Sequence, residues 1–323
     1  MRKSVIWLLF MVLILFIFLF YIFIGKGQVI KEEGQEAGFS YSIYTSVFPV
    51  YEVVKSIAGE GNNVELVVPS GAELHSYEPS PRRLAGLEKA DIFFYIGLDL
   101  EPWAEGMAKL LTSSGVRTVE LSDYLHLLKF EEIEEEEAHH EDHHHGVYDP
   151  HVWLDPENMK IMAAVIRDEL TALDPENMGK YQANYENYAR KIDELLVEYD
   201  EGLRELKQDT IIVSHAAFGY LARRYNFRQL SVSSLAPHGE PTPGNLARIV
   251  DTARKKNMKY IFLEPHLDRK MVEVVAREAG LEILILNPFI GLTEEERQNN
   301  EDYFSIMRKN LDNLKKALVD ADE

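Results

Sequence analysis

Short apolar runs alternate with stretches of helical spacing along most of the chain. The runs rich in β-branched and aromatic residues, each of which predicts a strand, lie at residues 41–45, 64–68, 92–96, 116–121, 210–213, 229–232, 260–263 and 281–286. Helical patterns fill most of the intervals between them, often opening with a proline such as Pro81 or Pro243, a residue favoured at the first position of a helix. Alternating strands and helices predict an α/β fold with mostly parallel sheets and helices on both faces.

The longest helical pattern separates these segments into two blocks. It opens at Asp174 and Pro175 and runs to about Lys207, with aromatic and apolar residues such as Tyr181 and Ile192 recurring at helical spacing. A stripe of this kind predicts a helix that packs against a core. We therefore predict an N-terminal lobe at residues 39–173, a linking helix at 174–207 and a C-terminal lobe at 208–323.

An uncharged apolar run extends from Val5 to Ile24 after a short basic start. A helix of that length rises about 30 Å, which is enough to span a bilayer. The run is longer than the roughly 7–15 apolar residues of a secretory signal, and no small-residue cleavage site follows it. We predict a transmembrane anchor at residues 1–27, with a cleaved signal as the alternative, and a polar tether at residues 28–38. Either version places the rest of the chain outside the cytoplasm.

The composition is acidic and lacks cysteine. The 323 residues are 46% hydrophobic and carry a formal net charge of −20. That charge argues against binding to nucleic acid, which needs a basic surface, and suits a protein that handles cations. The absence of Cys excludes disulfides, thiolate metal ligands, cysteine nucleophiles and a lipid anchor on Cys. A soft metal site must therefore use His, with carboxylates as the second choice.

A low-complexity tract of Glu and His interrupts the first block. Six of the seven residues at 131–137 are Glu, and five of the seven at 139–145 are His. Such a composition cannot bury a core, but it attracts metal ions. We predict an acidic, His-rich loop at residues 131–148, with a solvated linker of no function as the alternative. The weak accessory zinc ligands would be His139, His140, His143, His144 and His145.

Three other histidines each lie at the carboxyl end of a predicted strand or in the loop that follows it. His75 and His151 belong to the first block, and His215 belongs to the second. Ligands of open α/β sheets bind beyond the carboxyl ends of the strands. Three imidazoles that converged between two lobes would make a zinc site with one position left over. On the residues alone, the alternative is three ordinary surface or hydrogen-bonded histidines.

One segment formally matches the H-E-x-x-H pattern of metalloproteases, from His140 to His144. That motif needs a helix that carries both histidines on one face. This copy lies inside the Glu/His tract, where no apolar periodicity predicts a helix. We therefore do not interpret it as a protease site.

The motifs around the three strand-end histidines resemble those of the cluster A-I family, the metal-binding receptors of ABC transporters that capture zinc or manganese outside the membrane. The resemblance covers about residues 40–320 and rests on the stretches PSGAELHSYEPSPRRLAGLEKADIFFYIG, DPHVWLDPENM, IIVSHAAFGYLARRY and IFLEPHLDRKMVEVVAREAGLEILILNPFIGLT. It implies two βα lobes joined by one long rigid helix, with the metal site in the inter-lobe cleft. It also implies a receptor, expected to be monomeric, that delivers metal to a permease with its ATPase.

Carried over by motif, the resemblance implies His75, His151 and His215 as metal ligands. Relatives place an Asp or Glu in the loop after the last strand, where this chain has Asn287 and Ile290. The fourth position is therefore left to water or to another carboxylate. The candidate carboxylates are Glu73, Glu240 and Glu264. Two more histidines that follow strand ends, His238 and His266, are expected to lie near the site or on the surface without binding metal.

The donor set favours zinc. Three neutral imidazoles with at most one carboxylate suit Zn²⁺, whereas Mn²⁺ prefers more oxygen ligands. The sequence thus predicts a zinc receptor and not an enzyme. The alternatives are a manganese receptor of the same family, an exported zinc hydrolase, and a metal-buffering or adhesion module with no transport partner. A hydrolase would need a general base, and no motif supplies one.

Overall fold

The computed structural model describes residue 7 and residues 41–130, 147–233 and 242–320. Several predictions fall outside this part of the chain. They are the anchor run from Val5 to Ile24 except for Trp7, the tether at 28–38, the Glu/His tract up to residue 146, and the two candidates His238 and Glu240. In the described ranges, no helix has both the length and the hydropathy needed to cross a membrane.

The first sheet has four parallel strands in the order β2-β1-β3-β4. Its strands are β1 (Ser42–Thr45), β2 (Asn63–Leu66), β3 (Ile92–Tyr95) and β4 (Arg117–Glu120). A central parallel strand is covered on both faces and must be apolar throughout, whereas an edge strand needs only partial burial. For this reason IFFY forms β3, buried at every position, while NVEL forms the edge strand β2.

The second sheet repeats the same plan, with the order β6-β5-β7-β8. Its strands are β5 (Thr210–Val213), β6 (Arg228–Ser231), β7 (Tyr260–Leu263) and β8 (Glu282–Ile285). The central strand β5 is buried at every position, and the edge strands β6 and β8 are partly exposed. Two parallel sheets of equal strand order confirm the predicted two-lobed α/β fold.

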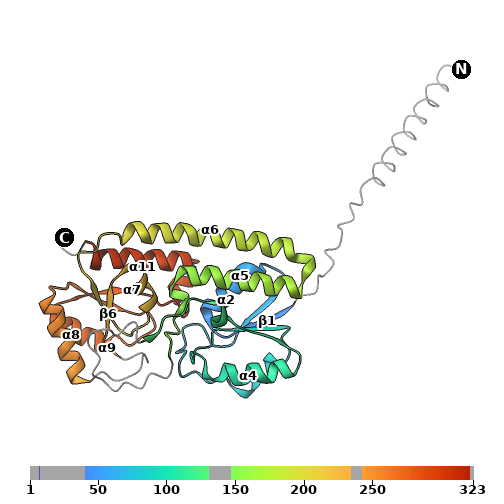
Figure 1. Ribbon diagram of the computed structural model, residues 1–323, viewed down its shortest axis with the longest axis horizontal. Coiled ribbons are helices and arrows are strands. Elements are labelled where there is room, and N and C mark those ends of the chain that lie inside the picture. The colour runs from blue at the N-terminus through green and yellow to red at the C-terminus, as the bar shows by residue number, and fades with distance from the viewer. Residues whose placement is uncertain (1–6, 8–40, 131–146, 234–241, 321–323) are drawn as a thin grey trace. The chain divides into compact units, whose positions relative to one another are not determined.

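Helices connect the strands in both lobes (Figure 1). Those around the first sheet are α2 (Phe48–Ala58), α3 (Pro81–Leu87), α4 (Pro102–Ser113) and α5 (Pro156–Leu173). Those around the second sheet are α7 (Gly219–Tyr225), α8 (Pro243–Lys255), α9 (Lys270–Ala279), α10 (Glu294–Gln298) and α11 (Tyr303–Leu318). Short 3₁₀ turns lie at Leu121–Tyr124, Val152–Leu154 and Pro175–Asn177.

The helix between the two blocks, α6 (Met178–Gly202), runs alongside α11 over one half of its length and alongside α5 over the other (Figure 1). It begins after a 3₁₀ turn and ends before Lys207, so it is shorter than the predicted pattern. At its end, a Cβ on Gly202 would approach Leu311 of α11 to 3.0 Å. Helix α6 therefore contacts helices of both lobes.

One apolar core continues through both lobes. It connects Phe94 of the first sheet with Val213 of the second, and it includes Trp153, whose side chain has no exposed surface. Burying one large apolar side chain stabilises a fold by about 1.5–3 kcal/mol. The two lobes therefore pack against each other through buried apolar side chains.

Candidate metal centre

The fold brings His75, His151 and His215 together from distant parts of the sequence. One ring nitrogen from each lies within 4.8 Å of the other two. His75 lies in the loop after β2, His151 precedes α5, and His215 follows β5. Over the described ranges, no other group of three or more His or acidic side chains comes together in this way.

His151 is buried, and Asp149 orients its ring. The Oδ1 atom of Asp149 accepts a hydrogen bond from the His151 backbone N–H at 2.9 Å and one from ring Nδ1 at 2.8 Å. The ring also lies edge-on to Trp153, with the ring centroids 5.5 Å apart. Because Asp149 is an acceptor, it fixes the hydrogen of the neutral ring on Nδ1 and leaves a lone pair on Nε2.

His215 is oriented in the same way by a carboxylate of the second lobe. Its Nδ1 atom hydrogen-bonds Glu264, which follows β7 and also accepts the hydroxyl of Ser214 at 3.0 Å. Burial, the largest single effect, lowers the pKa of His215, but the charge and hydrogen bond of Glu264, together with the charges of Asp149 and Glu73, raise the pKa above its ordinary value. His151 and His215 thus each have a buried carboxylate behind the ring.

The Nε2 atoms of His151 and His215 face each other at 3.2 Å. Without metal, a hydrogen on one of the two Nε2 atoms bridges this contact as a hydrogen bond. Once that proton leaves and both ring hydrogens lie on Nδ1, the two lone pairs point at the same space and can bind one cation. Two imidazole nitrogens on a tetrahedral zinc ion, with bonds of about 2.0–2.1 Å, are roughly 3.4 Å apart. The spacing of this buried pair fits a shared zinc ion.

His75 lies in a loop that is partly open to solvent. The backbone N–H groups of His75 and Ser76 donate to the carboxylate of Glu73 at 3.0 and 2.8 Å. This turn fixes the backbone, but within the described residues no carboxylate hydrogen-bonds the His75 ring. Burial, and then the charge of His151, lowers the pKa of His75 to about 3. The ring is therefore neutral near pH 7, which is the form that binds metal.

A contact between the lobes holds the start of this loop. The N–H of Gly71 donates to the carbonyl of Ile290 at 3.1 Å, and the N–H of Leu292 donates to Ser70 Oγ at 3.2 Å. A Cβ on Gly291 would lie only 2.1 Å from the nitrogen of Gly71, so no larger residue fits there. We call these five residues the inter-lobe latch.

His266 packs against the latch and not against the three histidines. Its Nε2 atom is 3.3 Å from the carbonyl of Gly291, and its ring would be 2.9 Å from a Cβ on Gly71. Asn287, which stands where relatives were expected to carry an acid, is buried and donates to Glu296 at 2.9 Å. The His266 ring therefore packs against the inter-lobe latch, and the Asn287 side chain holds the loop that follows β8.

The two described carboxylates that were candidates for the fourth position have other partners. Glu73 holds the turn of its own loop. Burial alone would raise the pKa of Glu73, but hydrogen bonds from Ser76 and His75 lower it below its usual value. Glu264 orients His215.

Sequence reasoning missed how firmly the second lobe holds the segment after His151. The indole N–H of Trp153 donates to the carbonyl of Pro288 at 2.7 Å, and the hydroxyl of Tyr303 donates to the Trp153 carbonyl at 3.0 Å. Asp149 lies two residues before His151, so its role as the hydrogen-bond acceptor of that ring could have been predicted from the sequence. Pro288 and Tyr303 gave no signal, because their partners lie more than a hundred residues away.

Known proteins share this fold over most of the chain. The family model for the zinc-uptake complex component A, periplasmic (ZnuA), matches residues 43–317. The zinc-binding lipoprotein AdcA of Streptococcus pneumoniae is 36% identical over 284 residues, which are 88% of this chain and 57% of AdcA. The chain therefore spans little more than half the length of that relative.

Two further comparisons cover nearly the full length of the other protein. The high-affinity zinc uptake system protein ZnuA of Bacillus subtilis is 33% identical over 290 residues, which are 90% of this chain and 91% of that protein. The crystal structure of the Zn(II)-bound ZnuA-like domain of Streptococcus pneumoniae AdcA superposes with a TM-score of 0.75 at 34% identity. The superposition covers 88% of this chain and the whole of that domain.

Proposed function

The chain belongs to the ZnuA family of zinc-uptake components, and we propose that it is an extracytoplasmic receptor that captures Zn²⁺ between its lobes and delivers it to an ABC transporter permease. His75, His151 and His215 would supply three nitrogen ligands. The fourth position would fall to water or to Glu240, because Glu73 and Glu264 are engaged elsewhere.

One observation carries this proposal. The buried Nε2 atoms of His151 and His215 lie 3.2 Å apart, each with a carboxylate on the opposite ring nitrogen. Two buried imidazole nitrogens this close need a proton or a metal ion between them, and the carboxylates behind the rings leave both Nε2 atoms available to a metal once the proton leaves. A carboxylate behind a histidine is also the usual support of a zinc ligand, because it fixes the tautomer and raises the basicity of the coordinating nitrogen.

The same donors favour zinc over manganese. Neutral imidazoles suit Zn²⁺ and other borderline metals, whereas Mn²⁺ prefers carboxylate, carbonyl and water oxygens in higher coordination. Zinc is therefore the proposed cargo, with a manganese receptor as the weaker alternative. We propose no enzymatic activity, because the matched family is described as an uptake component.

The test is a zinc titration of the purified full-length protein after complete chelation, in competition with a fluorescent zinc chelator. We expect one tight site together with weaker binding by the Glu/His tract. At free zinc about 1,000-fold above Kd, the folded state should gain ~4 kcal/mol, seen as a higher unfolding temperature. Absence of any tight site in the stripped protein would refute the proposal.

Matched histidine variants identify the ligands. Replacing His75, His151 and His215 together by Ala should remove the tight site and its thermal stabilisation. His126→Ala is the control, because His126 lies outside the group of three and should leave both unchanged. Equal loss in the control variant would show that zinc stabilises the fold elsewhere.

Delivery and location form a separate part of the proposal. The apolar run from Val5 to Ile24 would hold the receptor at the membrane, and the folded part would act as a monomer with a permease and its ATPase. Deleting the gene should slow zinc uptake by cells at low external zinc. The wild-type gene should restore uptake, and a gene encoding His151→Ala should not. Full uptake in the deletion strain would contradict the delivery role.

A further inference from the structure

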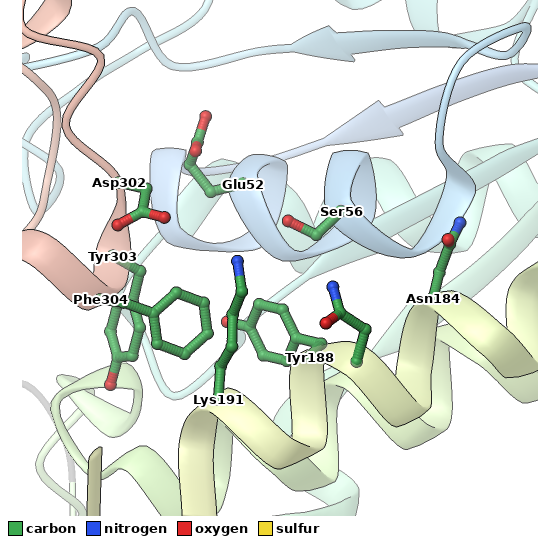
Figure 2. Close-up of a pocket in the computed structure, with 9 residues that line it drawn as sticks. Glu52, Ser56, Asn184, Tyr188, Lys191, Asp302, Tyr303 and Phe304 are labelled. Carbon is green, nitrogen blue, oxygen red and sulfur yellow. The ribbon is translucent and has the colours of Figure 1, made fainter. Parts of the chain in front are cut away.

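A cavity apart from the candidate metal centre lies where three helices meet, and none of the three histidines or their carboxylate partners lines it. Its volume is about 180 Å³, many times the roughly 15 Å³ that one water molecule requires. It is lined from α2, from α6 and from the start of α11 (Figure 2). The lining residues are Glu52, Ser56, Asn184, Asn187, Tyr188, Lys191, Asp302, Tyr303 and Phe304.

The charged side chains of this cavity are not paired with one another. Within the described residues, Glu52 makes no hydrogen bond or salt bridge. Burial, and then the charge of Asp302, raises its pKa above the usual value even though Lys55 opposes the shift. Lys191 has its ammonium 5.2 Å from the centre of the Phe304 ring and forms no ion pair among these residues. The cavity thus presents one ammonium group and two carboxylates. One of these, Asp302, also caps α11 by accepting the Ser305 N–H on Oδ1 at 2.8 Å, so its Oδ2 atom is the one left for a ligand.

Tyr188 adds an unused polar group. Its side chain is 5% exposed, and its hydroxyl is buried without a hydrogen-bond partner. A buried hydroxyl without a partner is costly and rare in folded proteins. The ring itself packs edge-on against Phe304, with the centroids 5.1 Å apart. One wall of the cavity is therefore aromatic, and the Tyr188 hydroxyl is buried behind it, away from the open space.

We propose that this cavity binds a small zwitterion, an α-amino acid with a small apolar side chain. The ligand ammonium would pair with Glu52 and Asp302, and its carboxylate would accept from Lys191. Its side chain would lie against Phe304. A free carboxylic acid or a free amine would satisfy only half of these groups, because the cavity carries charges of both signs.

Because of where the cavity lies, a ligand bound in it would affect the arrangement of the two lobes. Glu52 lies on α2 of the first lobe, Lys191 on the linking helix α6, and Asp302 at the start of α11 of the second lobe. One ligand would therefore contact both lobes and the helix between them. Binding would stabilise the present arrangement of the lobes and, with it, the spacing of the three histidines.

The experiment is calorimetric titration of the zinc-loaded full-length protein with L-alanine, L-valine and L-leucine. At least one of them should bind saturably. For valine, isovalerate lacks the ammonium and isobutylamine lacks the carboxylate, so each should bind at least about tenfold more weakly, as expected when one charged hydrogen-bonding group is lost. Lys191→Met and Glu52→Gln should each weaken the amino acid by a similar factor and leave tight zinc binding unchanged.

Two controls separate the site from general effects. Lys109→Met and Glu105→Gln remove the same charges from exposed positions of α4 and should change nothing. Tyr188→Phe should raise the unfolding temperature of the ligand-free protein, because it removes an unpartnered buried hydroxyl, and should leave amino-acid binding unchanged. The proposal is overturned if none of the three amino acids binds up to about 10 mM, if the half-ligands bind equally well, or if the cavity variants bind like the controls.

Discussion

His151 and His215 are held differently from His75. Each member of the buried pair has a carboxylate on its Nδ1 atom, and the segment after His151 is tied to the second lobe through Trp153 and Pro288. His75 lies in a partly open loop whose backbone is fixed by Glu73 and whose start is held by the inter-lobe latch. For the proposed zinc site, the comparison predicts two preorganised nitrogens and a third ligand that depends on the arrangement of the lobes.

The difference matters because binding is tighter when the ligands need no further ordering. Folding has already fixed the rings of His151 and His215, so zinc bound at the proposed site would gain the full benefit of both. His75 has no hydrogen bond from a carboxylate to its ring among the described residues, so part of its contribution offsets the cost of fixing that ring. The loss of zinc affinity should therefore differ between removal of His75 and removal of His151 or His215.

The largest expected effect comes from single alanine substitutions at the three histidines. His151→Ala or His215→Ala should weaken zinc binding by at least about a thousandfold, or ~4 kcal/mol, because each destroys the preformed pair. His75→Ala should cost about ten- to a hundredfold, because water can take the place of a ligand in a partly open loop. Competition titration measures all three. Equal losses at the three positions would contradict the distinction between the pair and the loop.

The next effect comes from the carboxylates behind the rings. Asp149→Asn and Glu264→Gln should each weaken zinc binding about 10- to 100-fold, the range seen when the outer partner of a metal-binding histidine is lost. Glu73→Gln is the matched control on the other side, because Glu73 holds backbone N–H groups and no ring. Glu73→Gln should lower zinc affinity less than Asp149→Asn or Glu264→Gln. A larger loss in Glu73→Gln would contradict the distinction between the buried pair and the His75 loop.

A smaller effect should follow from opening the latch. Gly291→Ala places a Cβ 2.1 Å from the nitrogen of Gly71, so the contact between the lobes must shift and the His75 loop must loosen. Zinc should dissociate about tenfold faster, ~1.4 kcal/mol, in a stopped-flow chelation experiment. Gly106→Ala is the control, because a Cβ at Gly106 meets nothing within 4 Å and alanine in a helix is ordinarily stabilising. Unchanged dissociation in Gly291→Ala would show that the latch does not hold His75.

The smallest effect on the tight site should come from removing the Glu/His tract. The residues that flank it are paired with each other, since Lys129 and Tyr148 form a β-bridge and the Asp149 N–H donates to Leu128. Deleting residues 131–145 should therefore leave the tight site within about threefold, or ~0.6 kcal/mol, and remove only weak binding in the same titration. Loss of the tight site would mean that tract histidines are ligands.

The sequence by itself determined the two sheets and drew attention to the three histidines. A buried parallel strand must be apolar along its whole length, so β3 and β5 could be read from short runs of residues. The loops at strand ends follow from the same pattern, and they contain His75, His151 and His215. The end of α6 at Gly202 could not be read in this way, because the helical pattern continued to Lys207. The close packing of Gly202 against Leu311, which a Cβ would approach to 3.0 Å, likewise joins segments far apart in the chain.

Only the tertiary structure decided which groups hydrogen-bond these histidines and pack around them. Glu264 could be named as a carboxylate near the site, but its hydrogen bond to His215 required the positions of β5 and β7. The approach of Gly71 to Gly291 and the unpartnered hydroxyl of Tyr188 likewise depend on segments far apart in the chain. The physical reason is that apolar burial follows a local periodicity, whereas hydrogen bonds and metal geometry depend on distances of a few tenths of an ångström between groups that only folding brings together.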